Sequence, residues 1–575
     1  MKHIGMMLLI IVVFLGGCAP ASRQMTPLPA MHEEETVTPE KNLFPAGYLR
    51  VNQLGYSPDG PKAAYFLTRQ AITNESFQLV DENNAAPVMD ITQIMDQGQY
   101  GSFDHLYVLD FSDWQKSGTF SIRVGEVQSY PFEINTGLYQ PLVGQSLKFF
   151  KVQHCGDTAP EGHGVCHLDD GVIVGGALDG TSMDAGGGWH DAGDYIKYSI
   201  TTGYSTLLLL HAVDINPESK DAQAVFDEAQ IGLNWLEKLW DAENQVLYYQ
   251  VSDDADHEEW RMPEDDTLNP RPVYACEAGK GANIAGKSAA AMALAGRLYE
   301  DASADWYDAE RAQQLLEQAK SLYEFGKQNP EAQPSNPADF YEEETSNDDM
   351  ALAAVMLYAA TKEENYAEDA KTWLTSLEAG NGFYWGEMGS LAYYYAAREN
   401  LTSAEEAGAF LQADLQPAAD LSAQRAFATG IAEFHWGSAE TMANLALEAM
   451  WYERITGDTG YRIMAMHQLD YILGANPWGV CWVSGVGSNW PKKPHHQIAD
   501  LTQSDLPGFW DEGAVPLSVF EEDGPEALLE ADEYAEFQSE EAVYHDDTED
   551  WVTNEPTITM NAAGLALSAW MGMQE

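Results

Sequence analysis

Basic residues are scarce in this chain of 575 residues, where 29 Lys and Arg stand against 91 Asp and Glu and the formal net charge is −62. No Lys or Arg follows Lys493. The missing basic footprint argues against nucleic acid as a partner, because phosphates are bound by Lys and Arg. The acidic excess fits a strongly solvated surface, as in proteins adapted to high salt, where screening relieves self-repulsion. Attraction of a cationic substrate, such as a glucosamine polymer, is the alternative.

Long apolar runs are also lacking. The one candidate, Met6–Phe14, follows Lys2, is too short to span a bilayer and is typical of the apolar region of a signal peptide. It ends in Leu-Gly-Gly-Cys at residues 15–18, which resembles the bacterial lipobox and implies cleavage before Cys18 and acylation of its thiol. Because Ala19 is not an acidic retention signal, we expect a secreted lipoprotein at the bacterial cell envelope, with the outer membrane or cell surface as its destination. A plain secretory peptide with a chance Cys is the alternative.

Cysteine is scarce too, with five residues in all. Apart from Cys18, four remain, which is too few to build a disulfide-dependent fold of this size. Two of them, Cys155 and Cys166, are close in sequence to His167 and His190, and two thiolates with two imidazoles make a ligand set that zinc prefers. The spacing alone fits a Cys155–Cys166 disulfide equally well.

The sequence pattern divides the chain into four parts. Residues 1–18 are the signal segment, and residues 19–45 hold Pro, Thr and Glu without periodicity, as in a flexible linker. Residues 46–137 show short alternating runs broken by turn residues, which predicts a β-sandwich. Residues 138–575 change to helical spacing, which predicts a large all-α domain. Helices are predicted at residues 138–151, 198–213, 222–240, 284–300, 305–327, 347–362, 364–378, 403–415, 437–455, 460–474 and 557–572.

A first candidate for chemistry lies between residues 186 and 195, in Gly-Gly-Gly-Trp-His-Asp-Ala-Gly-Asp-Tyr. Asp191 and Asp194 are separated by small residues, so their carboxylates can point the same way and together orient and deprotonate a water molecule. Glycine and tryptophan nearby suit a sugar site, where the backbone approaches closely and rings stack. Alone, the pair also fits a helix cap or calcium ligands.

A second candidate is Glu555, which lies just before the last apolar helix among aromatic residues. Desolvation beside aromatic groups raises the pKa of a Glu, which suits a general acid that must hold a proton near neutral pH. The alternative is a Glu in the first helical turn, stabilised by the helix dipole. The acidic stretch 511–550, which contains no basic residue, is predicted to be mostly a solvated surface loop.

Considered together, these segments resemble glycoside hydrolase family 9. The stretch at 186–195 resembles the catalytic-base segment of that family, and the stretch at 48–56 is similar to the immunoglobulin-like domain that precedes the catalytic domain in one branch. The resemblance spans about residue 48 to the C-terminus. Its C-terminal signature comprises Tyr544, Asp546, Trp551, Glu555, Thr557, Asn561 and Ala562, and its histidine signature comprises Val483, Ser484, Gly487, Asn489, Pro494, His495 and His496.

The resemblance implies an immunoglobulin-like β-sandwich followed by an (α/α)6 barrel. It also implies inverting, endoglucanase-like hydrolysis of β-1,4-glucosidic bonds in cellulose or a related β-glucan. Asp194 would be the general base, Asp191 would help to hold the attacking water, and Glu555 would protonate the leaving oxygen. Inversion needs acid and base carboxyl groups about 6.5–9.5 Å apart, which leaves room for a water on the far face of the sugar.

Two departures from the family pattern concern the substrate. Gln497 stands where the histidine signature normally ends in Arg, and Cys481 replaces a small opening residue. A neutral Gln has fewer donors and no charge, so the subsite bordered by His495 and Gln497, the candidate substrate-binding residues, is expected to be remodelled. An exo-acting enzyme on short oligosaccharides is therefore an alternative, either a β-glucosidase or cellobiohydrolase or an exo-β-glucosaminidase. A non-catalytic glycan-binding protein is a further alternative.

The resemblance also implies metals. In the branch with the immunoglobulin-like domain, Cys155, Cys166, His167 and His190 resemble a structural zinc site that braces the loop carrying Asp191 and Asp194. His154 or His163 would be the replacement ligands. Residues 346–349, Ser-Asn-Asp-Asp, resemble the calcium loop of the family, but the expected acidic partner is Gly386, with Glu387 beside it. Helix capping is the favoured interpretation of this loop.

Overall fold

The structure is a computed structural model that describes residues 47–72 and 76–574. The predicted signal segment, the lipid-bearing Cys18 and the linker 19–45 lie outside the described residues, so these stay predictions. Among the residues that are described, no helix is both long and apolar enough to cross a membrane. From Pro45 onward the chain forms one compact unit.

Residues 48–134 form a β-sandwich, as predicted. One sheet has the order β1-β3-β7-β6 and the other β2-β10-β8-β4-β5, with β9 paired to β8. Alternate side chains of both sheets, among them Phe66, Phe77 and Ile122, meet in a separate apolar core. The strands are β1 (Tyr48–Arg50), β2 (Gly55–Tyr56), β3 (Ala63–Thr68), β4 (Phe77–Asp81), β5 (Ala86–Ile91), β6 (Gln93–Asp96), β7 (His105–Asp110), β8 (Gly118–Val124), β9 (Val127–Gln128) and β10 (Phe132–Ile134). The sequence pattern missed β5 and β6, because their side chains are mostly exposed and show no apolar alternation.

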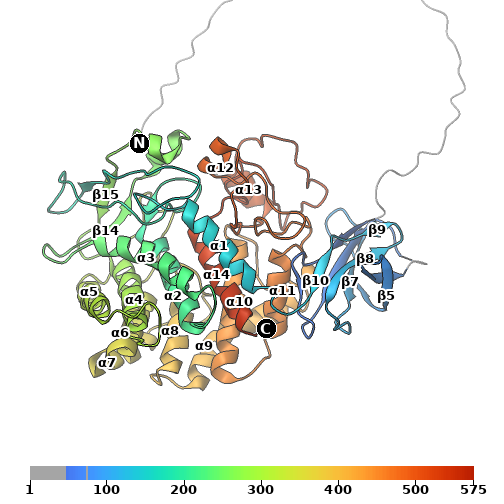
Figure 1. Cartoon of the computed structure of the whole chain (residues 1–575), viewed down its shortest axis with the longest axis horizontal. Helices are drawn as coiled ribbons and strands as arrows, with labels where there is room; N and C mark the ends of the chain where they lie inside the picture. The colour runs from blue at the N-terminus through green and yellow to red at the C-terminus, as the bar shows by residue number, and fades with distance from the viewer. Residues whose placement is uncertain (1–46, 73–75, 575) are drawn as a thin grey trace, which may run out of the picture. The chain divides into compact units, whose positions relative to one another are not determined.

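The remaining chain forms an (α/α)6 barrel, which confirms the predicted fold (Figure 1). Six inner helices contact one another in a closed ring, in which the last helix returns to the first. They are α2 (Ser199–Ile215), α4 (Ala282–Tyr299), α6 (Asn347–Thr361), α8 (Gly389–Arg398), α10 (Ser438–Thr456) and α14 (Ile558–Gln574). Six outer helices pack around them: α1 (Gln140–Val152), α3 (Ala222–Lys238), α5 (Ala309–Gln328), α7 (Glu364–Leu374), α9 (Ala404–Ser422) and α11 (Arg462–Ile472).

The two rings differ in how they are buried. Outer helices such as α3 and α5 bury one face, which produces the amphipathic spacing seen in the sequence. Inner helices such as α4 and α6 are buried nearly all round. The sequence pattern missed α8, whose short span is dominated by three consecutive tyrosines instead of a helical apolar stripe.

A small sheet beside the barrel was not predicted and positions two functional loops. Its order is β11-β15-β14-β12, formed by β11 (Val172–Val174), β12 (Lys197–Tyr198), β14 (Val246–Val251) and β15 (Pro272–Ala275), with β13 (Trp240–Asp241) paired to β14. The loop 183–196, which carries Asp191 and Asp194, leads directly into β12. The connection 252–271 joins β14 to β15, and β12 pairs with β14, so the two loops emerge side by side.

The sandwich is joined to the barrel by the turn between β1 and β2. Asn52 donates to the Asp470 carboxylate at 2.8 Å, and the backbone N–H of Gln53 donates to the carbonyl of Leu473 at 2.8 Å. The side-chain oxygen of Gln53 accepts from the amides of Ser488 and Asn489, both at 2.9 Å. The sandwich therefore helps to hold the segment that leads to His495.

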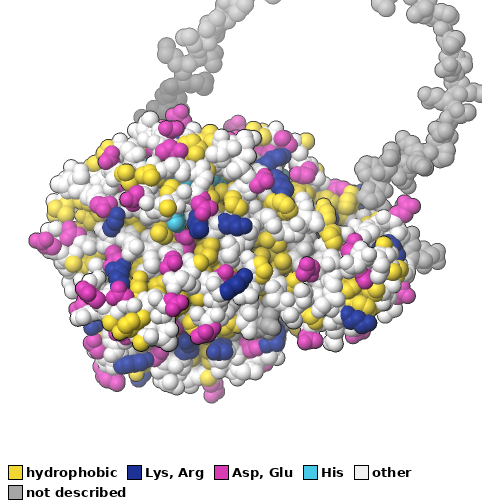
Figure 2. Space-filling view, in the orientation of Figure 1, with side chains coloured by type: hydrophobic (Ala, Val, Ile, Leu, Met, Phe, Trp, Pro, Cys, Tyr) yellow, Lys and Arg dark blue, Asp and Glu magenta, His cyan; other side chains and the backbone are white. Residues whose placement is uncertain are grey.

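Acidic side chains are spread over the face seen in Figure 2 without gathering into one patch. The acidic stretch 511–550 exposes most of its acidic residues, as expected of a solvated loop, although not along its whole length. It contains the short helix α13 (Leu517–Asp523), and four of its acids, Asp511, Glu512, Asp547 and Asp550, are buried. Burial here raises the pKa of Glu512 to about 8, with further contributions from neighbouring carboxylates such as Glu440.

Candidate active site

Three segments far apart in sequence meet at one end of the barrel. The backbone N–H of Gly193 donates to the Glu555 carboxylate at 3.0 Å, and the N–H of Gln497 donates to the carbonyl of Gly193 at 3.0 Å. The N–H of Ile558 donates to the carbonyl of Asp191 at 2.9 Å. The structure thus brings the two candidate carboxylate segments and the histidine segment into a single site.

Asp191 lies at the bottom of this site and is buried. Its carboxylate accepts hydrogen bonds from the hydroxyls of Thr201 on α2 and of Tyr341, the latter at 2.6 Å. Burial raises the pKa of Asp191 to about 7, against these two hydrogen bonds. The carboxylate caps no helix, so that alternative for the motif is wrong.

Asp194 has polar partners on both oxygens. One oxygen accepts from the backbone N–H of Ile196 at 3.1 Å, and the other lies 2.7 Å from Nε2 of His257. Burial acts to lower the pKa of His257, but its hydrogen bond with Asp194 and the charge of that carboxylate outweigh burial and raise the pKa to about 10. His257 is therefore a cation at neutral pH, and Asp194 sits in an ion pair.

The surroundings of Glu555 differ from those of Asp194 in their effect on the carboxyl group. Burial and, after it, the charge of Asp194 raise the pKa of Glu555 well above its usual value, and the hydrogen bond from Gly193 only partly offsets them. Helix α14 begins three residues later, at Ile558, so the first-turn interpretation of Glu555 is wrong. A carboxyl group that holds its proton beside an ion-paired carboxylate is the arrangement of a general acid and a general base.

His495 has two indole neighbours, with Trp260 at 5.0 Å and Trp551 at 5.9 Å between ring centroids. Its Nδ1 contacts the carbonyl of Thr548 at 2.6 Å, and burial lowers the pKa of the imidazole. Gln497 is buried, and its side-chain oxygen accepts from the backbone N–H of Arg261 at 3.1 Å.

Beneath the loop that carries Asp191 and Asp194, four buried side chains form a cluster that could hold a metal ion. The ligand atoms of Cys155, Cys166, His167 and His190 all lie within 4.8 Å of one another. Both cysteines are free, so the disulfide alternative is wrong. The two histidines named as replacement ligands are engaged elsewhere, because His154 pairs with Glu228 and His163 contacts backbone carbonyls.

The surroundings of this cluster are built for negative ligands. The ammonium of Lys197 lies 3.4 Å from the sulfur of Cys155. Burial acts to raise the pKa of Cys155, but its contact with Cys166 and the charge of Lys197 outweigh burial and lower it well below the usual thiol value. His167 uses its second nitrogen to contact the carboxylate of Asp266 at 3.0 Å, and such a carboxylate orients the ring of a metal-ligating histidine.

The model of glycosyl hydrolase family 9 matches residues 139–568, and the model of the cellulase N-terminal Ig-like domain matches residues 45–129. The chain belongs to glycosyl hydrolase family 9.

Relatives of this family 9 chain are similar along most of its length. A xyloglucan-specific endo-β-1,4-glucanase of Bacteroides ovatus is 26% identical, with 92% of this chain and 95% of the relative covered. A cellodextrinase of Butyrivibrio fibrisolvens is 28% identical, with 77% and 86% covered. The crystal structure of a metagenome-derived family 9 endoglucanase has a TM-score of 0.77 at 24% identity, covering 92% of this chain and 99% of that one, which shows the shared fold.

The structure adds three residues to this family 9 site that the sequence interpretation did not name. His257 pairs with Asp194, Tyr341 holds Asp191, and Trp260 flanks His495. The only sequence signal for His257 and Trp260 was a histidine and an aromatic residue within an otherwise acidic loop, and Tyr341 had none. They reach the site through the small sheet and the connection between α5 and α6.

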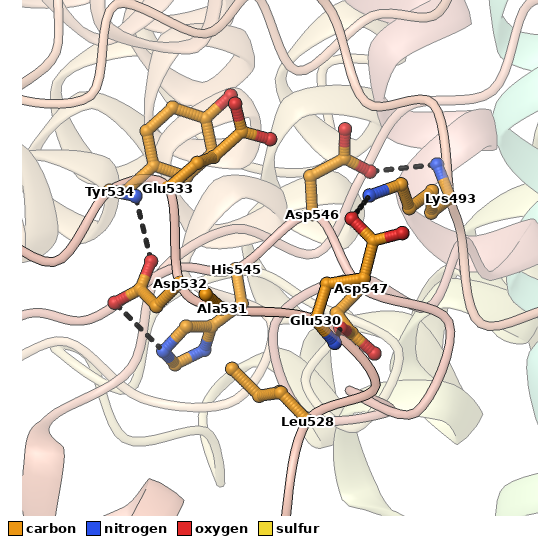
Figure 3. Close-up of a pocket in the computed structure, with 10 residues that line it drawn as sticks. All are labelled: Lys493, Leu528, Glu530, Ala531, Asp532, Glu533, Tyr534, His545, Asp546 and Asp547. Carbon is orange, nitrogen blue, oxygen red and sulfur yellow. Dashed lines mark hydrogen bonds and ion pairs between the residues drawn. The ribbon is translucent and has the colours of Figure 1, made fainter.

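A pocket of about 270 Å³ is lined by Lys493 and by residues between Leu528 and Asp547 (Figure 3). Its wall includes Asp546, which accepts from the amides of Lys492 and Lys493, and Asp547, which accepts from the amides of Leu529 and Glu530. Every carboxylate oxygen of these two residues accepts a hydrogen bond from a backbone amide. The signature residue Asp546 thus fixes the segment that leads into His495.

The expected helix cap at residues 346–349 is not formed. Ser346 precedes α6, but its hydroxyl donates to the carbonyl of Pro330 and makes no capping bond. Asp348 instead accepts from the N–H of Met388 at 2.6 Å, and Asp349 pairs with the buried ammonium of Lys287 at 2.7 Å. The capping interpretation is therefore wrong, and a fixed ammonium lies where the resemblance implied a calcium ion.

Proposed function

We propose that this family 9 enzyme hydrolyses β-1,4-glucosidic bonds of a β-glucan with inversion of anomeric configuration. The proposal is carried by one observation: a half-buried Glu555 and an ion-paired Asp194 lie in the same site, joined through Gly193. Burial raises the pKa of Glu555, as a general acid requires, and Asp194 is paired with His257 in a position to accept a proton.

In the proposed reaction Glu555 donates its proton to the glycosidic oxygen as the bond to the anomeric carbon breaks. A water molecule attacks that carbon from the opposite face, and Asp194 accepts the proton it loses. Asp191, held by Thr201 and Tyr341, orients the water. His257 keeps Asp194 in place until the proton arrives, and the product is the inverted anomer.

The substrate-binding role is assigned to His495 and Gln497. The indoles of Trp260 and Trp551 next to His495 offer aromatic surface for sugar rings. Gln497 is anchored to Arg261 and lacks the charge of an Arg, so it offers a weaker grip on sugar hydroxyls. The relatives are named for xyloglucan and for cellodextrins, and both are β-1,4-linked glucans that we propose as substrates.

We further propose zinc as the ion held by Cys155, Cys166, His167 and His190. Tetrahedral zinc at ordinary bond lengths places two nitrogens about 3.3 Å apart and a nitrogen and a sulfur about 3.6 Å apart. The histidine nitrogens are 3.4 Å apart, and two nitrogen–sulfur pairs are 3.6 and 3.8 Å apart. All four protein ligands are present, so the ion braces the loop of Asp191 and Asp194 and leaves no position for a reacting water.

The lipid anchor at Cys18 and a place at the bacterial cell envelope remain part of the proposal. Both rest on the sequence of residues 1–19, which lie outside the described residues.

Hydrolysis of carboxymethylcellulose, xyloglucan, cello-oligosaccharides and chitosan oligomers tests this function. Immediate NMR of the products is expected to show the α-anomer, and the viscosity of the polymers is expected to fall quickly. Glu555→Gln and Asp194→Asn should abolish both signals, whereas Glu526→Gln, a change at an exposed carboxylate, should not. Retained configuration, or full activity in either of the first two variants, would contradict the proposal.

The products and the viscosity change also distinguish the alternative functions of the protein. Slow release of single sugars without a drop in viscosity would indicate an exo-acting enzyme, and preference for chitosan oligomers would indicate a glucosaminidase. Glycan binding without any hydrolysis would indicate a receptor.

A further inference from the structure

A second buried charge cluster lies in the wall of the barrel, away from the three catalytic carboxylates. Lys287 on the inner helix α4 is completely buried, and its ammonium contacts the carboxylates of Glu343 and Asp349. Asn283, one turn earlier on α4, donates to the second oxygen of Glu343. Neither the sequence interpretation nor the proposed reaction uses this cluster.

Two glycines on neighbouring helices leave space for the close packing around Lys287. Gly203 on α2 faces the lysine so closely that an added Cβ would lie 3.1 Å from the Cβ of Lys287. Gly286 on α4 allows the backbone of Asp349 on α6 to approach, since a Cβ there would lie 2.7 Å from it. Three inner helices thus converge on one side chain.

The cluster holds more negative than positive charge. Glu343, Asp348 and Asp349 are buried, and the segment before α8 adds the half-buried Glu387. One oxygen of Asp348 and the carboxylate oxygens of Asp349 have no hydrogen-bond partner among the described residues, although Asp349 has its ion pair with Lys287. Buried carboxylates at this density need a cation, and Lys287 is the one that the structure provides.

We propose that the ammonium of Lys287 is a built-in cation that fills the position of a calcium ion in the barrel wall, and that removing this side chain uncovers a calcium site. Calcium takes six to eight oxygen ligands in flexible arrangements, and the carboxylates of Glu343 and Asp349 already contact the ammonium. Like a calcium ion, the lysine ammonium carries positive charge, which is localised at the end of a flexible side chain. The native protein therefore needs no calcium at this position.

Lys287→Ser in the full-length chain tests the proposal, with Lys62→Ser as the matched control. Lys62 is equally buried, but its ammonium donates to the carbonyls of Ser57, Pro58 and Gly60 and meets no carboxylate there. Proteins dialysed against metal-depleted buffer are measured for bound calcium by equilibrium dialysis and for Tm with and without millimolar CaCl2.

We expect Lys287→Ser to bind one calcium ion more than the wild type, with a rise in Tm of roughly 2–4 °C on calcium addition. Wild type and Lys62→Ser should show no such gain, and Mg2+ should not replace Ca2+ because it demands a tighter octahedral site. If Lys287→Ser accumulates as folded protein only when calcium is present, the proposal is supported.

Two results would overturn it. One is a Lys287→Ser protein that calcium neither binds nor stabilises, whether or not that protein folds. The other is a wild-type protein that binds calcium and loses the binding on Glu343→Gln, which would mean that the ion and the lysine share the cluster. Neither result bears on hydrolysis, so the proposed function is tested separately.

Discussion

The two sides of the proposed active site, with Asp194 as base and Glu555 as acid, are built by different means. On the base side, Asp194 is held by a backbone amide and by His257 from another loop. The loop that carries Asp194 also adjoins the cluster of Cys and His residues that could hold a metal ion. On the acid side, Glu555 has one hydrogen bond, from Gly193, and its chemistry follows mainly from burial. A charged base needs partners, whereas a protonated acid needs dry surroundings, so the base side depends on more of the chain.

The largest expected effect is on the chemistry itself. Asp194→Asn and Glu555→Gln should each lower kcat on a natural glucan by about 10²–10⁴-fold, the usual share of acid–base catalysis. An aryl glucoside whose leaving group needs no proton should restore much of the rate to Glu555→Gln and none to Asp194→Asn. Equal rescue of the two variants, or of neither, would contradict the assignment of acid and base.

Glu555→Gln should also change the thermal stability of the protein in a pH-dependent way. The pKa of Glu555 is raised in the folded state, so the unfolded chain loses this proton first as the pH rises above about 4.3, and wild-type stability falls there. Glu555→Gln should therefore have a higher Tm than wild type at pH 7 and an equal one at pH 4. Thermal unfolding followed by circular dichroism at both pH values measures this, and an unchanged difference between them would contradict it.

The next effect concerns the cluster of Cys155, Cys166, His167 and His190, close to the loop that carries Asp194. Asp266→Asn removes the charged partner of His167 and should weaken zinc affinity by about 10–100-fold. Competition with a chromogenic chelator measures the affinity directly, and kcat should fall only when zinc is lost. Asp265→Asn is the neighbouring control, since no contact of Asp265 with the cluster is seen. Equal zinc affinity in the two variants would argue against a bound ion at His167.

A smaller effect is expected from His257→Gln, which keeps a donor near Asp194 but removes the charge. Misplacement of the base should lower kcat by about 10–100-fold. The pKa of His257 is raised to about 10 in the folded state, so its ion pair stabilises the protein fully below its unfolded pKa of about 6.5. That contribution is lost as the pH rises through 10. The Tm difference from wild type should shrink over this range, and a constant difference would exclude the ion pair as its cause.

The smallest effect on catalysis is expected at the sandwich. Asn52→Ala leaves the buried Asp470 without its donor and should cost about 1–3 kcal/mol of stability in urea unfolding. The value of kcat should be unchanged at temperatures where the protein stays folded. Asn84→Ala, on an exposed turn of the same sandwich, should cost little. A fall in kcat for Asn52→Ala alone would show that the sandwich acts on the site as well as on stability.

The acid side was also the more predictable side. Glu555 lies within one short signature next to a helix, and the outer helices carry clear amphipathic spacing. The partners of the base, His257 and Tyr341, come from loops that only the small sheet and the connection before α6 bring close, and no local pattern records such contacts. Lys287 was missed for a related reason, because a lysine in an alanine-rich helix gives no sign of being buried until its carboxylate partners are placed.

The ring of inner helices closes where α14 meets α2, and Glu555 lies three residues before α14 begins. During synthesis this helix is the last inner element to leave the ribosome, so the nascent chain holds an open barrel and no acid until its final segment is complete. Closure of the fold and arrival of the proton donor are then one event. A chain cut short before residue 555 therefore lacks both the helix that closes the ring and Glu555.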